Sequence, residues 1–481
     1  MFLPPKNNAS ILARNDSYSM AANLTSFLVG VAVILLVPKV IGVEEYGYFQ
    51  LFLFFIGYVG FFHFGWADGI ILRYAGETWE SLSRPRFSGQ IHAFLFFEIA
   101  LWGLFALASW LYFGQGARLF VLLCTAVGAV LVLANTFLRF ILQAANRIKV
   151  YAFLVLLERL VYLVCVLSVL FIGARDFRFF IVAYLTAQGA TLIGALWFCR
   201  DLVLARPETA RAVFRESAEC IRVGIKLMLA NVASILILGI IRLGIERAWG
   251  IAVFGKISLL LSVVSILFVF VNAASLALLP ALRREEHERF RTLYFPSRIT
   301  LTWVLLVSFL FAYPASRLVA LWLPAYADSL GYLPLVLPVC LFESSVSLLT
   351  GTYLKVLRRE KDFLIGNTAA LLVSTVFLVI SIPVLHNLAL AVLAMPASLA
   401  VRSWFLEKRL AARLDVNVMP VFATEVLASV AFIGLSLGVG GFTGSILYAV
   451  FLLSAFLISR KTFWKTPLPS LSFLAHKRFK R

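Results

Sequence analysis

Long apolar stretches recur along the whole chain, and they restrict its fold more than any other feature. Runs such as 24–37, 259–271 and 369–384 lie in stretches long enough to cross about 30 Å of hydrocarbon as a helix. Of the 481 residues, 62% are hydrophobic and 14% are charged. One buried core cannot absorb that excess, because cores stop growing near about 300 residues. The sequence predicts an all-α membrane protein; barrel strands would alternate, and these runs do not.

About fourteen transmembrane helices are predicted, as two lobes of six helices and two further helices. The predicted spans are 17–42, 46–72, 90–113, 119–144, 151–173, 177–199, 221–245, 249–280, 299–323, 331–354, 363–384, 387–406, 420–439 and 442–459. The predicted parts are a first lobe over 1–200, a cytoplasmic linker over 201–220, a second lobe over 221–406, and the last two helices with a basic cytoplasmic tail over 407–481.

Basic residues in the loops predict the orientation. Loops on one side carry clusters within 200–222, 283–291 and 355–361, whereas loops on the other carry few, such as Arg118 and Arg178. Basic loops of membrane proteins gather in the cytoplasm. We therefore expect both termini there. The net charge of +19 is dispersed over these loops, so we expect no nucleic-acid partner.

An internal repeat links the two predicted lobes. Nine positions between 20 and 51 carry the same residue 208 positions later, including the polar pair Asn23 and Asn231 within two apolar segments. Six spans separate the copies, so both enter the membrane from the same side. Repeats of this parallel kind are related by an axis along the membrane normal, and they favour a substrate site between the lobes with alternating access.

Motifs of soluble enzymes are missing from the sequence. It contains no P-loop, no G-x-S-x-G elbow and no zinc-binding spacing, and its five cysteines lie in or next to apolar segments. We therefore expect no enzymatic activity, no cofactor and no metal. Since no nucleotide-binding motif is present, we expect energy from a gradient or from a downstream reaction that removes the product.

Charged and polar residues inside the predicted spans are the functional candidates, because intramembrane charges are costly and usually face a bundle interior or an aqueous cavity. The candidates for a substrate-binding cavity are Lys256, Arg73, Asp68, Asn23, Asn231, Asn272 and Arg159. The candidates for proton coupling are Glu98, Glu158 and Glu343. Cations in such a cavity suit a phosphate-bearing substrate, with Lys256 as the first choice.

Each candidate also has a structural interpretation. Lys256 either binds substrate or forms a structural ion pair or snorkelling end. Glu98 either pairs across the bundle, for instance with Arg159, or exchanges protons. Arg73 either marks the edge of the membrane or contacts substrate. These alternatives stay open at the level of the sequence.

Four segments resemble the bacterial oligosaccharide flippases, the Wzx-like polysaccharide transporters of the MOP superfamily. They are VIGVEEYGYFQLFLF (40–54), GWADGIILRYAGE (65–77), the stretch 245–284, and LFESSVSLLTGTYLKVLRREKD (341–362), the last similar to flippases of Gram-positive capsular and exopolysaccharide systems. Members often carry an acidic residue before the arginine of the seventh helix, where this chain has Ile241 before Arg242.

The resemblance implies two six-helix lobes around a central cavity in the bacterial cytoplasmic membrane. It implies an undecaprenyl-pyrophosphate-linked oligosaccharide as substrate, flipped to the outer face for polymerisation, with membrane lipids and polymerase machinery as partners. A drug or organic-cation antiporter of the same superfamily is the first alternative, and it would need an acid-lined site. A membrane polymerase or ligase is the second, and it would need a large outer loop.

Overall fold

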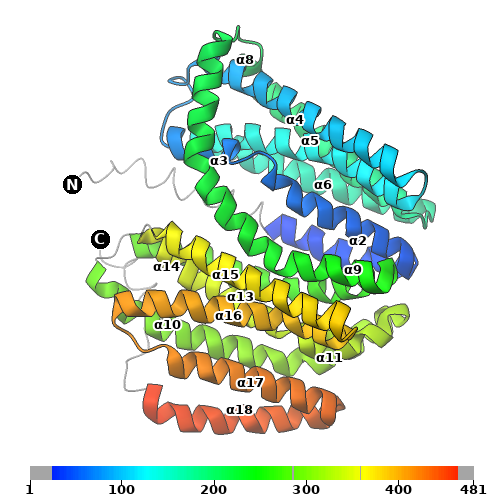
Figure 1. The fold of residues 1–481 in the computed structure, drawn as a ribbon, viewed down its shortest axis with the longest axis vertical. Helices are drawn as coiled ribbons and strands as arrows, with labels where there is room; N and C mark the ends of the chain where they lie inside the picture. Colours follow the sequence, from blue (N-terminus) through cyan, green and yellow to red (C-terminus); the bar gives the residue numbers. More distant parts are fainter. Residues whose placement is uncertain (1–23, 284–286, 358, 464–481) are drawn as a thin grey trace. The chain divides into compact units, whose positions relative to one another are not determined.

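The computed structural model describes residues 24–283, 287–357 and 359–463, and all regular structure in these ranges is helical (Figure 1). The predicted all-α class is therefore confirmed. The chain divides into two compact units, Met1–Val232 and Ala233–Arg481. Asn23 lies outside the described residues, and so does the side chain of Asn272.

Most helices of the first unit are long, and short loops connect them. They are Leu24–Val40, α2 (Val43–Tyr58), η1 (Val59–Phe61), α3 (Trp66–Tyr74), α4 (Arg84–Phe113), α5 (Ala117–Ala144), α6 (Ile148–Ile172), α7 (Phe177–Phe198) and α8 (Arg200–Val203). The long helix α9 (Ala210–Arg283) then crosses the division between the units.

The second unit contains more broken and bent helices than the first. They are α10 (His287–Ser308), η2 (Phe309–Phe311), α11 (Ala312–Trp322), η3 (Pro324–Tyr332), α12 (Leu333–Val336), α13 (Pro338–Ser344), η4 (Ser345–Thr350), α14 (Gly351–Val356), α15 (Glu360–Val379), η5 (Ile380–Val384), α16 (Leu388–Leu414), α17 (Met419–Gly438) and α18 (Gly441–Phe463). Of these, η4 and η5 are π-helical turns.

Described helices correspond to all the predicted spans, although residues 17–23 of the first span lie outside the described residues. Within the described residues, ten helices are long and apolar enough to cross a membrane, and two bent pairs raise that number to twelve. Helix α9 is interrupted at Gly250, whose φ of 83° and ψ of 177° are not helical, so it supplies two of the predicted spans. A shorter apolar helix, Leu24–Val40, matches the first predicted span.

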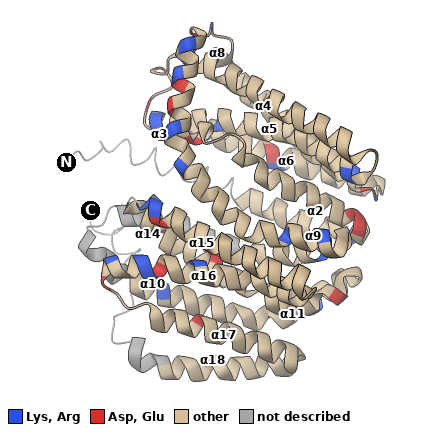
Figure 2. Cartoon of the chain, viewed as in Figure 1, with Lys and Arg blue, Asp and Glu red and all other residues tan. Residues whose placement is uncertain are grey.

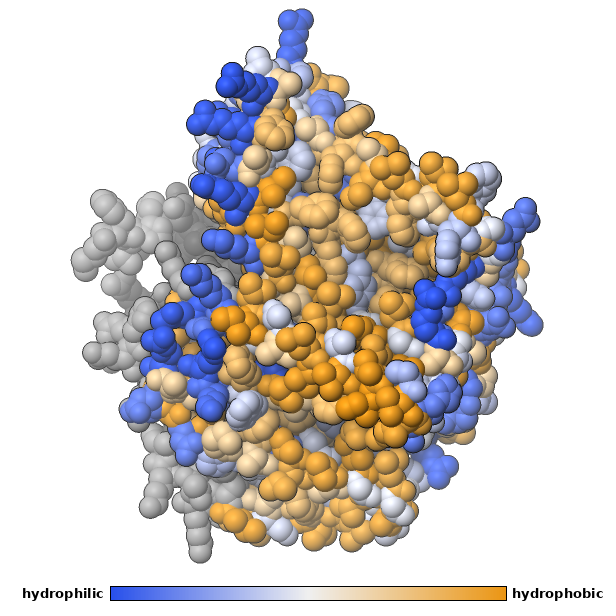
Figure 3. Space-filling model, viewed as in Figure 1, coloured by the Kyte–Doolittle hydropathy of each residue, from blue (hydrophilic) through white to orange (hydrophobic). Residues whose placement is uncertain are grey.

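The surface of the helices is suited to lipid. Large apolar side chains such as Phe96, Leu111 and Phe171 are exposed, and apolar residues cover much of the face shown in Figure 3. Charged residues lie mainly near helix ends (Figure 2). Exposed apolar area on this scale is not tolerated by a monomeric protein in water, so the chain is a multi-pass membrane protein.

Helices α3 and α9 cross in backbone contact within the first unit. A Cβ atom added at Gly69 would overlap the backbone of Cys220, and one added at Gly224 would overlap that of Gly65. Small residues permit such close approach, which gains van der Waals contact where no hydrophobic driving force exists. The first residues of α9, which the sequence places in a linker, therefore pack on α3.

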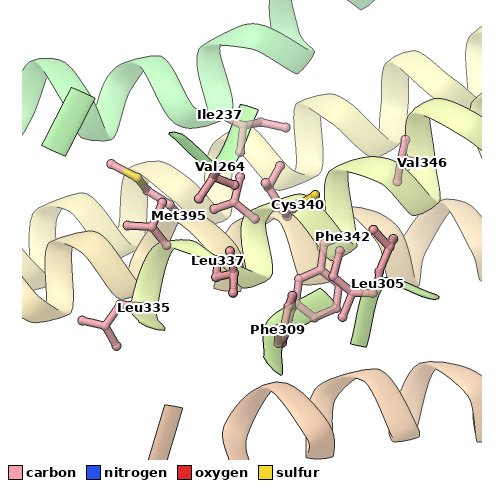
Figure 4. Close-up of a cluster of buried hydrophobic side chains, with 14 of the residues drawn as sticks. Ile237, Val264, Leu305, Phe309, Leu335, Leu337, Cys340, Phe342, Val346 and Met395 are labelled. Carbon is pink, nitrogen blue, oxygen red and sulfur yellow. The ribbon is translucent and has the colours of Figure 1, made fainter. Parts of the chain in front are cut away.

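An apolar core holds the second unit together (Figure 4). Ile237 of α9, Leu305 of α10, Phe342 of α13 and Met395 of α16 are all buried in it. These helices lie far apart in the sequence, so the core joins the beginning of the unit to its end. Close packing of such side chains supplies the dispersion contacts that hold helices together in lipid.

Three fully buried charged side chains meet in the second unit: Arg298 on α10, Glu407 on α16 and Glu425 on α17. Arg298 donates to Glu407 Oε1 from Nε at 3.0 Å and from Nη2 at 2.7 Å. It donates to both oxygens of Glu425, at 2.5 and 2.6 Å. This acidic triad ties α17, one of the two helices beyond the predicted lobes, to α10 and α16. Glu407 lies just past the predicted end of its span at 406, in the part of α16 that continues to Leu414.

We expect replacement of Arg298 by Met to destabilise the protein by about 3 kcal/mol or more, because it leaves two buried carboxylates without a cation. The apparent thermal transition of the purified protein in detergent should fall. The triple variant Arg298→Met, Glu407→Gln and Glu425→Gln should recover most of the loss, and Arg222→Gln, at an exposed pair, should cost about 0–1 kcal/mol. Equal losses in all three variants would contradict a charge-based role.

We expect Gly69→Val to disrupt the crossing of α3 and α9, since no space exists for a side chain there. The matched control is Gly103→Ala on α4, where an added Cβ meets nothing within 4 Å. That substitution should be neutral or slightly stabilising, because alanine favours helix. Yield and thermal transition in detergent measure both, and a folded Gly69→Val protein would refute the crossing.

Candidate functional site

A partly exposed group of charged side chains inside the predicted spans lies between α5 and α6 in the first unit. Arg139 Nη1 donates to Glu158 Oε2 at 2.7 Å, and Arg159 Nη2 lies 3.8 Å from Glu158 Oε1. We call Arg139, Glu158 and Arg159 the arginine cluster. One carboxylate faces two guanidinium groups, so the cluster has a net charge of +1.

The tight turn between α5 and α6 sets the geometry of the arginine cluster. Asn146, with φ of 56°, reverses the chain, and Arg147 N donates to Leu142 O at 2.8 Å. Glu158 is ten residues into α6, or roughly 15 Å from the turn. Arg139 precedes the turn, and long helical side chains lean toward the helix N-terminus, which carries its guanidinium to the level of Glu158. The cluster therefore lies well inside the span.

Exposure differs among the three side chains. Glu158 is 9% exposed, Arg139 15% and Arg159 37%. The Nε atom of Arg159 is buried and has no hydrogen-bond partner. Arg159 is thus accessible and incompletely bonded, which leaves donors for an anionic ligand.

Neighbouring polar groups are bonded to one another. Asn135 Nδ2 donates to Gln188 O and Oε1 at 2.9 and 3.0 Å, and Gln188 Nε2 donates to Tyr184 Oη at 3.2 Å. The Tyr184 ring lies edge-on to Tyr162 and Phe52. These contacts join α2, α5, α6 and α7 around the arginine cluster and fix the helices that carry it.

The helix predicted over 46–72 is broken before α3. Phe64 and Gly65 have positive φ values, and the segments Val43–Phe61 and Trp66–Tyr74 are bent by 52°. At the break, His63 Nδ1 accepts from Gly65 N at 3.0 Å, and His63 Nε2 lies 3.9 Å from Asp68 Oδ2. Asp68 therefore sits beside a histidine that the sequence analysis did not select, although broken membrane helices often mark functional sites.

Arg73 is engaged with the first turns of α9. Its Nη1 atom lies 2.8 Å from Glu216 Oε1 and 3.7 Å from Cys220 Sγ, and Tyr74 Oη also donates to Glu216. These contacts reinforce the crossing of α3 and α9. They favour the structural interpretation of Arg73.

Glu98 on α4 is fully buried and has one bonded oxygen. Trp102 Nε1 donates to its Oε2 at 3.2 Å, while Oε1 has no partner. Among the cations that the structure describes, none lies within ion-pair distance of Glu98. The pair suggested for Glu98 and Arg159 does not form here, because Arg159 has Glu158 as its neighbour.

In the second unit, Lys256 forms an ion pair with Asp328 of η3, with 2.5 Å between Nζ and Oδ2. Arg402 on α16 is fully buried and donates to Glu343 Oε2 at 2.6 Å and to Ser234 Oγ at 2.8 Å. Glu343 thus has a cationic partner that the sequence analysis missed. Asn231 is exposed on α9.

A pocket of about 440 Å³ lies at the turns around residues 76–80 and 143–147. Arg147 stacks over the Trp79 ring at 4.1 Å, and Trp79 Nε1 donates to Asp201 at 2.9 Å. These contacts hold the loops together. The pocket belongs to loop packing at the ends of the spans rather than to a site inside them.

Several residues of the buried ion pairs were not selected as candidates, although the sequence contains evidence for some of them. Glu425 stands alone in the apolar span 420–439, which is the mark of a buried acid with a distant partner. Arg298 and Glu407 were harder to find, because each falls just outside a predicted span. Arg139 was visible inside a span, but only the structure shows that it shares Glu158 with Arg159.

Comparison with solved structures shows the fold. One similar structure is a lipid II flippase MurJ in an inward closed conformation, with a TM-score of 0.65, 12% identity, and coverage of 93% of this chain and 98% of the other. Another is an inward-facing multidrug resistance MATE family transporter of the MOP superfamily, with a TM-score of 0.61, 13% identity, and coverage of 83% and 98%. The fold of this chain is similar to the folds of these two proteins.

At these identities the likeness is one of fold. No protein-family model matches the chain, and no curated protein matches it. These two structures are a flippase and a transporter, and the expected lack of enzymatic activity in this chain stays a prediction. The fold fits the predicted superfamily, and the Wzx-like subtype stays a prediction.

We expect Lys256 and Asp328 to act as a pair. Lys256→Gln and Asp328→Asn should each lower thermal stability by about 0–1 kcal/mol, because the aspartate is largely exposed, and exchange of the two residues should restore it. If the exchange of the two residues does not restore stability, the ion pair does not contribute to it.

Proposed function

We propose that the protein translocates an undecaprenyl-pyrophosphate-linked oligosaccharide from the inner to the outer face of a bacterial cytoplasmic membrane. The arginine cluster is the observation that carries this proposal, since it provides a net positive charge and an accessible guanidinium inside a span. Arginine binds phosphate oxygens in bidentate fashion, and the pyrophosphate at the lipid–sugar junction offers such oxygens.

Two further observations support this proposal. The fold is similar to that of a lipid II flippase, a protein whose substrate is lipid-linked. The chain also has exposed apolar helix surfaces along which a polyprenyl tail can stay in lipid while the polar head moves. Capsular or exopolysaccharide synthesis, with polymerase machinery acting on the flipped unit, is the process that we propose it serves.

The proposal also includes the predicted lobes, the orientation of the termini and the remaining candidate residues. The lobes 1–200 and 221–406, related by the internal repeat, would expose the arginine cluster alternately to the two faces, with both termini in the cytoplasm. Lys256, Arg73, Asp68 and Asn231 would be secondary contacts, since three of them already have partners in the structure. Glu98 and Glu343 are the proposed places for proton coupling.

An antiporter of drugs or organic cations is the second candidate. Its support is the likeness to a multidrug resistance MATE transporter and the buried acid Glu98, which lacks a cation among the residues described. A cation substrate would need such an acid and would be repelled by the arginine cluster. The flippase therefore needs a positively charged binding site, whereas the antiporter needs a negatively charged one.

We expect deletion of the gene to trap the lipid-linked repeat unit on the inner face, where a membrane-impermeant lectin applied to protoplasts cannot reach it. The wild-type protein should restore outer exposure. The double variant Arg139→Gln, Arg159→Gln should restore it at less than about a tenth of the wild-type rate, because both phosphate-binding guanidiniums are lost.

The matched control is Arg178→Gln on α7, which removes an exposed arginine of a surface pair and should leave export unchanged. Protein levels and thermal transitions are compared for all variants. Unpolymerised units on the outer face of the deletion strain would point to a polymerase or ligase defect. Unchanged lipid-linked sugars, together with loss of ethidium efflux, would favour the antiporter.

A further inference from the structure

We infer that Glu158 competes with the phosphate of the substrate for Arg139 and Arg159. Its carboxylate pairs with the two guanidinium groups when no substrate is bound, and an arriving anion displaces it. This inference rests on the proposed function and assigns Glu158 a role in setting affinity. It replaces proton coupling as the role proposed for this residue.

The two arginines are held unequally by Glu158. Arg139 makes a direct hydrogen bond of 2.7 Å, whereas Arg159 stands 3.8 Å away and is beyond hydrogen-bond range. Arg159 is also the most exposed of the three side chains. An anion therefore meets Arg159 first, and it can bond to Nη1 of Arg139 only by replacing a carboxylate oxygen of Glu158.

A purely structural ion pair would not need the second arginine. Arg139 and Glu158 already neutralise each other, so Arg159 adds an intramembrane charge without a full partner. No hydrogen bond joins Arg159 to the amides of Asn135 and Gln188, whose described bonds run to each other and to Tyr184. A charge inside a span is costly even when it is partly exposed, and the presence of Arg159 is explained if a mobile anion completes the cluster.

Competition by Glu158 suits a transporter. With Glu158 ionised, the cluster offers one net positive charge to a pyrophosphate; without it, the cluster offers two. A carboxylate about 5 Å from the bound phosphate weakens binding by at least tenfold at the effective dielectric constant of about 20 that describes protein sites. A transported substrate must also leave, so a site that binds too tightly is slow to release it.

The test measures binding of farnesyl pyrophosphate to the purified full-length protein in lipid nanodiscs by isothermal titration calorimetry. Glu158→Gln should bind this probe at least tenfold more tightly than wild type, and it should export the lipid-linked unit more slowly at equal protein level. Arg139→Gln and Arg159→Gln should bind it more weakly.

Asp176→Asn is the matched control. It removes the same charge, from an exposed pair with Arg178, and asparagine retains the cap that Asp176 Oδ1 provides to Arg178 N at the start of α7. Its affinity for the probe should equal that of wild type. A control variant that also gained affinity would show a general charge effect and overturn the inference.

The outcomes separate the inference from the function. If both arginine variants lose affinity but Glu158→Gln does not gain it, Glu158 is a structural partner and only the inference fails. If wild type binds no probe, or binds it independently of the arginines, the proposed function fails too. Should Glu158→Gln not fold, Glu158→Asp tests the same point: its shorter reach should raise probe affinity several-fold, and an unchanged affinity would overturn the inference.

Discussion

Hydrocarbon offers no hydrogen bonds, so a charge inside the membrane is costly unless it finds a partner within the protein. This constraint explains which helices pack together. Arg298 joins α10 to α16 and α17, Arg402 joins α16 to α13, and Arg139 joins α5 to α6. In every case the partners lie on different helices, so an ion pair also selects the neighbour against which a helix packs.

The acidic triad and the arginine cluster both pair charges inside the membrane, but their ratios of acid to arginine are opposite. The triad has two acids around one arginine, is closed on all sides, and leaves no room for a ligand. The arginine cluster has two arginines around one acid and keeps Arg159 accessible. Closed pairing holds helices together, whereas open pairing with spare positive charge can bind an anion.

The first unit also shows how irregular backbone is kept inside a membrane. The break at Gly65 releases backbone groups from the helix, and they are satisfied locally, in part by His63. Gly69 and Gly224 let α3 and α9 meet at the backbone beside this break. Irregular backbone at membrane depth is tolerated where protein covers it, and the crossing provides that cover.

The sequence by itself determined that the chain is all-helical and roughly where the spans lie, because apolar length is a local property. It did not predict the break at Gly65 or the extension of α16 to Leu414. It also marked Glu98, Glu158, Arg159 and Glu343 as costly charges that needed an explanation. Only the tertiary structure decided their partners. The pairs Glu158 with Arg139, Glu343 with Arg402, and Glu425 with Arg298 join different helices. Spacing along the chain does not encode such contacts, because they depend on how the helices pack.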